Sequence, residues 1–121
     1  MDRLEIGKKG EEYAKKFLLA KGCKVLEENF YSRFGELDII AVEGETLLFV
    51  EVKTRTSDKF GDAEEAVDRR KIEKILKTAL HFLSETSRKH YDDLRMDLIV
   101  VRLNGRHELE RIKHIKNIRD G

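Results

Sequence analysis

The spacing of apolar and polar residues divides the chain of 121 residues into seven predicted elements. In chain order they are a helix at 2–21, strands at 24–31, 35–42 and 46–53, a second helix at 62–89, and strands at 95–103 and 108–115. Short strands combined with two long helices are typical of a mixed sheet with helices packed on it. We therefore expect one α/β domain covering residues 1–121, with a central sheet of about five strands and the order α-β-β-β-α-β-β.

Capping residues set the limits of the two predicted helices. Asp2 followed by Glu5 forms a capping box, and Gly22 is a typical helix end. Asp62 with Glu65 predicts the same kind of cap for the second helix. The apolar residues at helical spacing are Leu4, Ala14, Phe17 and Leu18 in the first helix and Ile72, Ile75, Leu76, Ala79, Phe82 and Leu83 in the second. We expect both stripes to face the sheet.

The turn between the second and third predicted strands decides which side chains face each other. A two-residue turn at 44–45 pairs position 43 with position 46, and counting back places Asp38 opposite Glu51. By the same count Glu36 lies opposite Lys53. A three-residue loop would need a bulge to keep this register. Alternation gives one face to Glu36, Asp38, Ile40, Phe49, Glu51 and Lys53, and the other to Leu37, Ile39, Ala41, Leu48, Val50 and Val52.

Two opposed carboxylates on an otherwise apolar hairpin carry an energetic cost. Opposed residues have Cβ atoms about 4.5–5.5 Å apart, so the charges of Asp38 and Glu51 repel each other. The apolar run at 47–50 predicts burial, which makes bare charge more costly. A divalent cation with oxygen ligands would offset the repulsion directly, and Lys53 would offset it in part. The alternative is an ordinary ion pair of Glu51 with Lys53 on an exposed sheet face, and the pattern alone leaves both open.

The first helix contributes a third candidate acid. Glu11 is four residues after Gly7, three before Ala14 and seven before Leu18, so it shares the face of the apolar stripe. Glu12 falls on the opposite, wet side. An inward carboxylate needs a partner, and the Asp38/Glu51 pair is the candidate. A helix-surface acid is the alternative interpretation of Glu11.

Composition limits the classes of protein that the chain can belong to. Charged residues make up 40% of the sequence, yet the net charge is only +1, so the whole-chain balance does not indicate a polyanion partner. Residues 1–24 and 102–121 each carry an excess of three basic residues, and the middle is acidic by five. That distribution fits a basic rim around a carboxylate cluster, although a solvated surface of mixed charge is the simpler explanation. One cysteine, Cys23, excludes an internal disulfide. No signal peptide or membrane-spanning run is present, which predicts a cytoplasmic protein without a membrane partner.

The spacing of the acids carries a resemblance to a known group of enzymes. Asp38 followed by Glu51-Val52-Lys53 resembles the motif of the PD-(D/E)xK nuclease superfamily, whose core is the restriction-endonuclease-like fold. Four strings of the chain resemble the bacterial YraN-like family of predicted endonucleases, which is similar in outline to archaeal Holliday junction resolvases. These strings are 7–11 (GKKGE), 35–38 (GELD), 49–55 (FVEVKTR) and 95–97 (RMD). One departure is Leu37, which stands where the superfamily motif has a proline.

The resemblance implies a metal-dependent endonuclease that hydrolyses phosphodiester bonds of DNA, including branched or damaged DNA. Mg²⁺ or Mn²⁺ would be held by Asp38, Glu51 and the backbone carbonyl of Val52, with Glu11 as a further ligand or acting through a water. Lys53 would orient the attacking water or neutralise charge on the phosphate. Glu36 would be a second ligand or the partner of Lys53. The alternatives are a nucleic-acid-binding module with this fold and little activity, or an adaptor whose acidic face is incidental.

Basic residues near the motif are candidates for contacts with nucleic acid. They are Arg55 after the third strand, Arg70 and Lys71 early in the second helix, and Arg33 in the loop before the second strand. For each the alternative is a solvated cation. Arg95 and Asp97 predict a structural ion pair at a sheet edge, and His81, His90, His107 and His114 are predicted at the surface. Cys23 is predicted to be a buried small side chain. Symmetric cleavage of a junction would need two sites, so a homodimer is one hypothesis.

Overall fold

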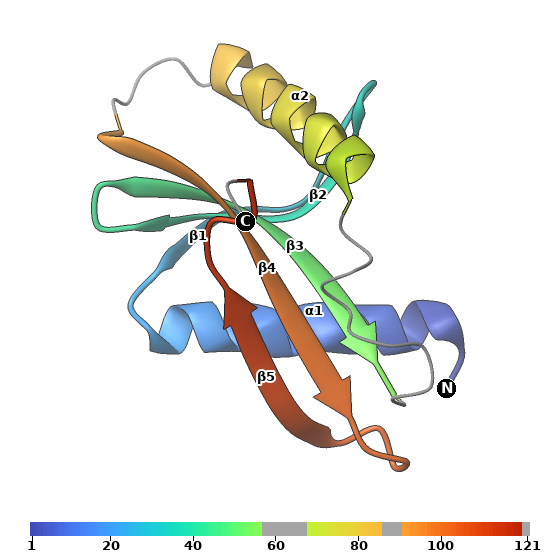
Figure 1. The fold of residues 1–121 in the computed structure, drawn as a ribbon. Coiled ribbons are helices and arrows are strands. Elements are labelled where there is room, and N and C mark those ends of the chain that lie inside the picture. The colour runs from blue at the N-terminus through green and yellow to red at the C-terminus, as the bar shows by residue number, and fades with distance from the viewer. Residues whose placement is uncertain (57–67, 86–90, 120–121) are drawn as a thin grey trace.

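The computed structural model describes residues 1–56, 68–85 and 91–119 (Figure 1). Its elements are α1 (Arg3–Ala20), β1 (Lys24–Ser32), β2 (Gly35–Glu43), β3 (Thr46–Arg55), α2 (Arg69–Glu85), β4 (Asp93–Leu103) and β5 (Leu109–Ile115). The five strands form one sheet in the order β1-β2-β3-β4-β5. Neighbouring strands are antiparallel except β3 and β4, which are parallel. The predicted mixed α/β architecture and element order are confirmed.

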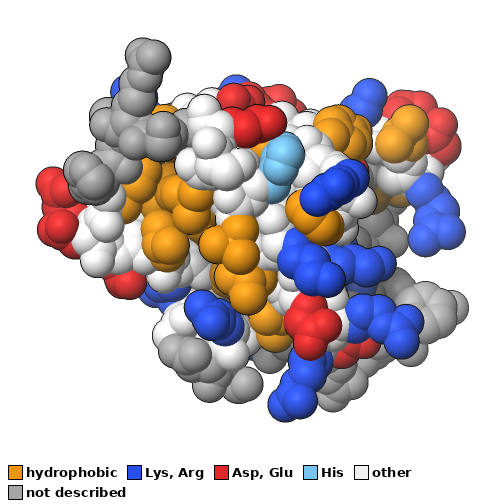
Figure 2. Space-filling model, turned by 90° about the horizontal axis from the view of Figure 1, so that it is seen from above, with side chains coloured by type: hydrophobic (Ala, Val, Ile, Leu, Met, Phe, Trp, Pro, Cys, Tyr) orange, Lys and Arg blue, Asp and Glu red, His pale blue; other side chains and the backbone are white. Residues whose placement is uncertain are grey.

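The two helices lie on opposite faces of the sheet (Figure 1). On the α1 side, Ala14 and Leu18 pack with Val50 and Ile99 in one core cluster. The core cluster on the α2 side includes Leu37, Ile40, Phe49, Ile75 and Phe82. Because α2 packs mainly against β2 and β1, it leaves part of β4 and β5 uncovered on this face. Figure 2, seen from above α2, shows a band of apolar side chains across this face with Lys and Arg side chains gathered beside it.

The first helix begins and ends as predicted. The side chain of Asp2 accepts a hydrogen bond from the Glu5 N–H at 2.9 Å, and Gly22 adopts φ 92° just after the helix. The prediction that Leu4 faces the core is wrong, because Leu4 is 70% exposed. Packing of α1 on the sheet begins only with Ile6, one half-turn later. Neither described helix is long and apolar enough to cross a membrane.

The second helix begins at Arg69 in the described part of the chain. Asp68 caps it, since its Oδ1 accepts a hydrogen bond from the Lys71 N–H at 3.0 Å. The predicted cap at Asp62 and Glu65 lies outside the described residues, as does the predicted helix end near position 89. The helix therefore presents three consecutive basic residues in its first turn, at 69–71.

The register of the central hairpin follows the predicted two-residue turn. Glu43 pairs with Thr46 and the ladder runs to the pair Ile39 and Val50, with Gly44 at φ 60° in the turn. Beyond that pair β2 leaves β3. The predicted alternation on β2 is wrong at one position, because Leu37 packs on the α2 side with Ile40 and not on the α1 side with Ile39.

A local irregularity in β1 explains this change of face. Asn29 adopts φ 50°, a left-handed conformation, between the regular pairs Glu28 with Ile39 and Phe30 with Leu37. Asn is one of the few residues besides glycine that tolerates this conformation. The register puts Asn29 opposite Asp38, so the interruption lies at the predicted site. Regular pairing of β2 is therefore interrupted at Asp38 on both sides, by Asn29 in β1 and by the end of the ladder with β3.

The first helix approaches the end of β3 very closely. A Cβ atom placed on Gly10 would overlap the side chain of Thr54, so only glycine fits at this position. The contact fixes the height of α1 above the strand that carries Glu51 and Lys53. It also sets the position of Glu11, the next residue of the helix.

Candidate active site

The candidate site lies where β2 separates from β3. Continuing the confirmed register by one step places Asp38 opposite Glu51, as the sequence predicted. The Asp38 carboxylate takes up the Val52 N–H, with Oδ2 accepting a hydrogen bond of 2.8 Å. A hydrogen bond from the backbone to a side chain thus replaces the backbone ladder at this step. Glu51 is only 5% exposed and Asp38 is half-buried, so the predicted acidic pair is present and largely shielded from solvent.

Glu51 is incompletely paired. Its Oε1 lies 3.2 Å from the Nζ of Lys71, in the first turn of α2. Its Oε2 is buried and has no hydrogen-bond partner among the described residues. A buried charged oxygen without a donor costs on the order of 1–3 kcal/mol or more. Lys71 was predicted to contact nucleic acid, and the structure places its ammonium on the candidate catalytic carboxylate.

The pKa of Asp38 is raised, first by burial and then by nearby negative charge. Burial and then the charge of Glu51 raise the pKa of Asp38 to about 7, although the hydrogen bond from the Val52 N–H and the charge of Lys71 act in the other direction. The nearby carboxylate of Glu36 raises it further. Near neutral pH, the raised pKa leaves a large fraction of Asp38 protonated, and a divalent cation would displace that proton.

Two further acids flank the pair and share one amide. With its amide nitrogen turned toward them, Asn29 donates to Glu11 Oε1 at 3.0 Å and to Glu36 Oε1 at 3.1 Å. Burial raises the pKa of Glu11, and the charge of Asp38 adds to the effect. The inward position predicted for Glu11 is thus confirmed, while Glu12 is exposed. Asn29 is a site residue that the sequence argument missed. Its signal was its place opposite Asp38 when the first two strands are paired.

The predicted pairing of Glu36 with Lys53 is wrong. The β2–β3 ladder stops before it reaches them, and Glu36 pairs with Tyr31 of β1. Lys53 lies two residues after Glu51, on the same face of β3, and is half-buried. Within the described ranges Lys53 forms no ion pair. Its ammonium is therefore not committed to another described carboxylate.

The other predicted basic contacts remain peripheral to the carboxylates. Arg55 donates to the carbonyl of Thr54 at 3.3 Å. The guanidinium of Arg33 stacks over the Phe34 ring, 4.8 Å from its centroid. Arg70 is exposed in the first turn of α2. Among the described residues, none of these three is bonded to an acid of the site.

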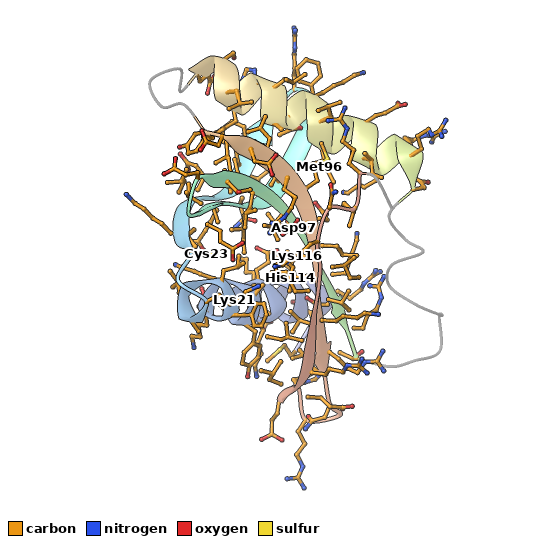
Figure 3. All side chains as sticks on the ribbon, turned by 60° about the vertical axis from the view of Figure 1, so that its left-hand side comes forward. Lys21, Cys23, Met96, Asp97, His114 and Lys116 are labelled. Carbon is orange, nitrogen blue, oxygen red and sulfur yellow. The ribbon has the colours of Figure 1, made fainter. Side chains whose placement is uncertain are left out.

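A second buried acid, Asp97 on β4, has a contrasting environment (Figure 3). Arg95 donates to both of its oxygens at 2.8 Å, the Asn117 N–H donates at 3.0 Å, and His114 Nε2 lies at 2.7 Å. Lys21 Nζ is 3.0 Å from His114 Nδ1, and since an ammonium can only donate, Nε2 carries the hydrogen that faces Asp97. Burial alone would raise the pKa of Asp97, but the bonds from His114, Arg95 and Asn117 outweigh it and hold that pKa well below its usual range.

Three expectations about this cluster are settled by the structure. The predicted ion pair of Arg95 and Asp97 is confirmed, but its predicted place at a sheet edge is wrong, because β4 lies between β3 and β5. The surface position predicted for His114 is also wrong. Its side chain is 7% exposed, since it packs edge-on against Phe17 and bonds Asp97. Cys23 is 5% exposed, as predicted, while His90 lies outside the described residues.

The donor set of the candidate site suits a hard divalent cation. Asp38 and Glu51 offer carboxylate oxygens, one of which is buried without a partner among the residues that the structure describes. Carboxylate and carbonyl oxygens are the ligands that Mg²⁺ and Mn²⁺ prefer. In the described part of the chain, no three His, Cys, Asp or Glu side chains converge closely enough to hold a metal ion. Loading the site would therefore require Lys71 to leave Glu51 or Glu11 to approach.

Fold and site together define a small mixed α/β protein with a buried acidic pair at the separation of two strands. Sequence comparison gives its family. The model of the uncharacterised protein family UPF0102 matches residues 10–101, a range that includes Glu11, Asp38, Glu51 and Lys53. The chain belongs to this family, which confirms the YraN-like family expected from the motifs.

Full-length relatives support the assignment. A UPF0102 protein of Thermodesulfovibrio yellowstonii is 42% identical over 117 residues, covering 97% of each chain. One from Vibrio campbellii is 43% identical over 103 residues, covering 84% of each chain. A third, from Mycolicibacterium vanbaalenii, is 39% identical over 116 residues, covering 96% of this chain and 94% of the relative. The similarity thus extends over nearly the whole fold.

Proposed function

We propose that this protein is a metal-dependent endonuclease of the PD-(D/E)xK superfamily that hydrolyses phosphodiester bonds of DNA, including branched or damaged DNA. The observation that carries the proposal is the acidic pair, in which Asp38 has its pKa raised to about 7 and Glu51 keeps a buried oxygen without a described partner. Perturbed, under-paired carboxylates are typical of functional sites. The restriction-endonuclease-like arrangement expected from the motif is compatible with the observed element order.

Each residue of the site has a separate role in this proposal. Asp38 and Glu51, with the carbonyl of Val52, would hold Mg²⁺ or Mn²⁺, and Glu11 would serve as a further ligand or bind through a water. When bound, the ion supplies a Lewis acid for the phosphate and lowers the pKa of a water molecule. Lys53, two residues from Glu51 on the same face of β3, orients the attacking water or neutralises charge that develops on the phosphate.

Lys71 supports the proposal by its position. Its ammonium lies 3.2 Å from Glu51 Oε1, so it neutralises the carboxylate that the divalent ion would neutralise. Lysine and metal therefore compete for Glu51. A lysine released from Glu51 at the first turn of α2 is available to the phosphate of a substrate.

The test is cleavage of labelled DNA. Four-way junctions, linear duplexes and single strands are incubated with Mg²⁺, Mn²⁺ or EDTA, using the wild type, Lys53→Ala and the control Lys24→Ala. Lys24 is an exposed strand lysine at the start of β1, away from the site. Metal-dependent product from the wild type and the control, but not from Lys53→Ala, would support the proposal.

Two other results would count against it. Equal product from all three proteins would place the activity elsewhere or in a contaminant. Salt-dependent DNA binding without product from any of them would select the alternative, a nucleic-acid-binding module with this fold.

A further inference from the structure

A groove on the α2 side of the sheet lies next to the candidate site. It has a volume of about 710 Å³ and runs between the first half of α2 and the segment that follows β5. Its floor includes Leu98, Ile115 and Ile118, and its rim includes Arg69, Lys116 and Arg119. The groove exists because α2 packs mainly on β2 and β1 and leaves β4 and β5 partly uncovered.

The rim of the groove is basic. Arg69, Lys116 and Arg119 are exposed, and none forms an ion pair with another described residue. Glu73 is the acid that lines it within the described ranges. The space-filling view of this face shows Lys and Arg side chains beside the apolar band (Figure 2). Such a groove is complementary to a polyanion whose charged groups meet the basic rim and whose less polar parts, between those groups, meet the apolar floor.

Two hydrogen bonds fix one side of the rim in place. The Asn117 N–H donates to Asp97 Oδ1 at 3.0 Å, and the Ile118 N–H donates to the carbonyl of Met96 at 2.8 Å. Asn117 adopts φ 58°, which turns the chain after β5 (Figure 3 labels Met96, Asp97 and Lys116). The backbone that carries Lys116 and Arg119 is therefore ordered before any ligand binds. Preorganisation reduces the entropic cost of binding.

The groove is adjacent to the candidate site. Leu98 in its floor pairs with Glu51 across the β3–β4 ladder. At the rim, Arg69 lies two residues before Lys71, whose ammonium contacts Glu51. A nucleic-acid strand with one phosphate at Glu51 would therefore enter the groove by passing over β4 and the first turn of α2.

From these observations we infer that the groove binds the sugar–phosphate backbone of a single nucleic-acid strand flanking the bond that the site cuts. The volume is that of a site for a drug-sized molecule, or roughly two nucleotides of one strand, and is too small for a duplex. The lining residues within the described chain include no aromatic ring, so bases are not stacked and the contact does not depend on sequence. This inference rests on the proposed function, because it takes a nucleic acid as the substrate.

The test compares two charge-neutralised variants by fluorescence anisotropy. The groove variant is Lys116→Gln with Arg119→Gln, and the control is Lys16→Gln with Arg106→Gln, which removes the same charges at exposed positions that do not line the groove. Binding to a labelled single-stranded oligonucleotide is measured in EDTA between about 50 and 200 mM salt. Urea unfolding of each variant confirms that the fold is retained.

The groove variant should lose about 0.7 of the slope of log K against log salt for each lost phosphate contact, or about 1.4 in all. Its loss of affinity should be about sevenfold larger at ~50 mM than at ~200 mM salt, for oligonucleotides of any sequence, while the control keeps the wild-type slope. An equal loss in the control, or no loss in the groove variant, would overturn the inference. So would a dimeric wild type that the groove substitutions convert to monomer, since the groove would then hold a second copy of the chain.

The outcome is distinguishable from that of the cleavage test. If the wild type binds single strands through the groove but cleaves no substrate, the inference about the groove is supported and the proposed activity is contradicted. Cleavage that depends on Lys53, together with a salt slope that is unchanged in the Lys116→Gln/Arg119→Gln variant, would support the proposed activity and contradict the groove.

Discussion

Two buried acids on neighbouring strands differ in how their charge is compensated. Asp97 on β4 is fully buried and is bonded by Arg95, His114 and the Asn117 N–H, so both of its oxygens have donors. Glu51 on β3 is 5% exposed and, within the described part of the chain, has a single ion pair, with Lys71. The pKa of Asp97 is held well below its usual range, whereas burial and Glu51 raise that of Asp38, the partner acid, to about 7.

The difference shows that burial alone does not decide what a carboxylate contributes. A buried acid with a full set of donors is tolerated by the fold, and removing its charge destabilises the protein because the donors are left buried and unpaired. A buried pair with too few donors destabilises the fold, and a sequence that keeps such a pair has a reason outside stability. Substituting each acid by its amide should therefore separate a structural role from a functional one.

The largest effect is expected on cleavage. If the proposed function holds, Glu51→Gln should lower the metal-dependent cleavage rate by roughly a thousandfold or more, since in that proposal it removes a ligand of the divalent ion; that corresponds to about 4 kcal/mol. Single-turnover cleavage of the best DNA substrate measures it, with exposed Glu45→Gln as the control. A Glu51→Gln protein that retains a tenth of the wild-type rate would show that this acid is not part of the chemistry.

The next largest effect is expected on stability, at the other acid. Asp97→Asn should lower the free energy of unfolding by about 3–5 kcal/mol, because Arg95 loses the charge of its buried partner. Urea denaturation at neutral pH measures this, with exposed Asp92→Asn as the matched control. A loss no larger than that of the control would mean that the Asp97 network is energetically neutral.

The same substitution at the under-paired site should have the opposite sign. In EDTA at about pH 8, Asp38→Asn should raise the free energy of unfolding by about 2–3 kcal/mol, because it removes a desolvated charge beside Glu51. The amide oxygen of the new side chain still accepts the Val52 N–H. Denaturation curves of this variant and of Asp97→Asn form one experiment, and a destabilised Asp38→Asn protein would contradict the assignment of a cost to the acidic pair.

The pH dependence should differ in sign between the two acids. The pKa of Asp38 is raised in the folded state, so its contribution is fully present below the unfolded pKa near 4 and is lost as pH rises through about 7. Metal-free wild type should lose on the order of 2 kcal/mol between about pH 5 and pH 8, and Asp38→Asn should not. Asp97, whose pKa is lowered, contributes above pH about 4 and loses that contribution in acid. Urea midpoints across this pH range test both signs, and a flat wild-type profile above pH 5 would refute the first.

The smallest effect is expected from the competing lysine. Lys71→Met should tighten Mn²⁺ binding because it removes the cation that competes with the metal for Glu51. The gain should be only several-fold, equivalent to about 1 kcal/mol, because Lys71 is partly exposed and its attraction to Glu51 is screened by solvent. Calorimetric titration with Mn²⁺ measures the affinity, and Lys77→Met, an exposed lysine of the same helix, is the control. Weaker Mn²⁺ binding in Lys71→Met would show that the lysine assists the metal.

Short-range rules sufficed for much of this molecule. The Asp2 cap, the alternation along β3 and the two-residue turn at 44–45 depend on neighbours in sequence, and together they placed Asp38 beside Glu51. The family motifs pointed to the same pair. The features that the sequence did not predict depend on contacts between distant segments.

Three such features illustrate the limit. The left-handed Asn29 moves Leu37 to the other face, and nothing in the local alternation signals it. Lys71 reaches Glu51 only because α2 starts at Arg69 and lies over the sheet. Asp97 is interior because β4 is a central strand, and the side chain of His114 on the edge strand β5 is buried because it packs edge-on against Phe17 and bonds Asp97.

The sheet topology also has a consequence for the order of folding. The antiparallel run β1, β2 and β3 joins close neighbours in sequence, whereas the parallel β3–β4 ladder pairs Thr46 with Asp93 across a long connection that includes α2. Local contacts close with a smaller loss of chain entropy and tend to form first. Asp38 and Glu51 therefore meet on the early hairpin, while Lys71 arrives only when α2 docks. This order would bring two like charges together before Lys71 of α2 is in place, so we expect their repulsion to slow this step of folding.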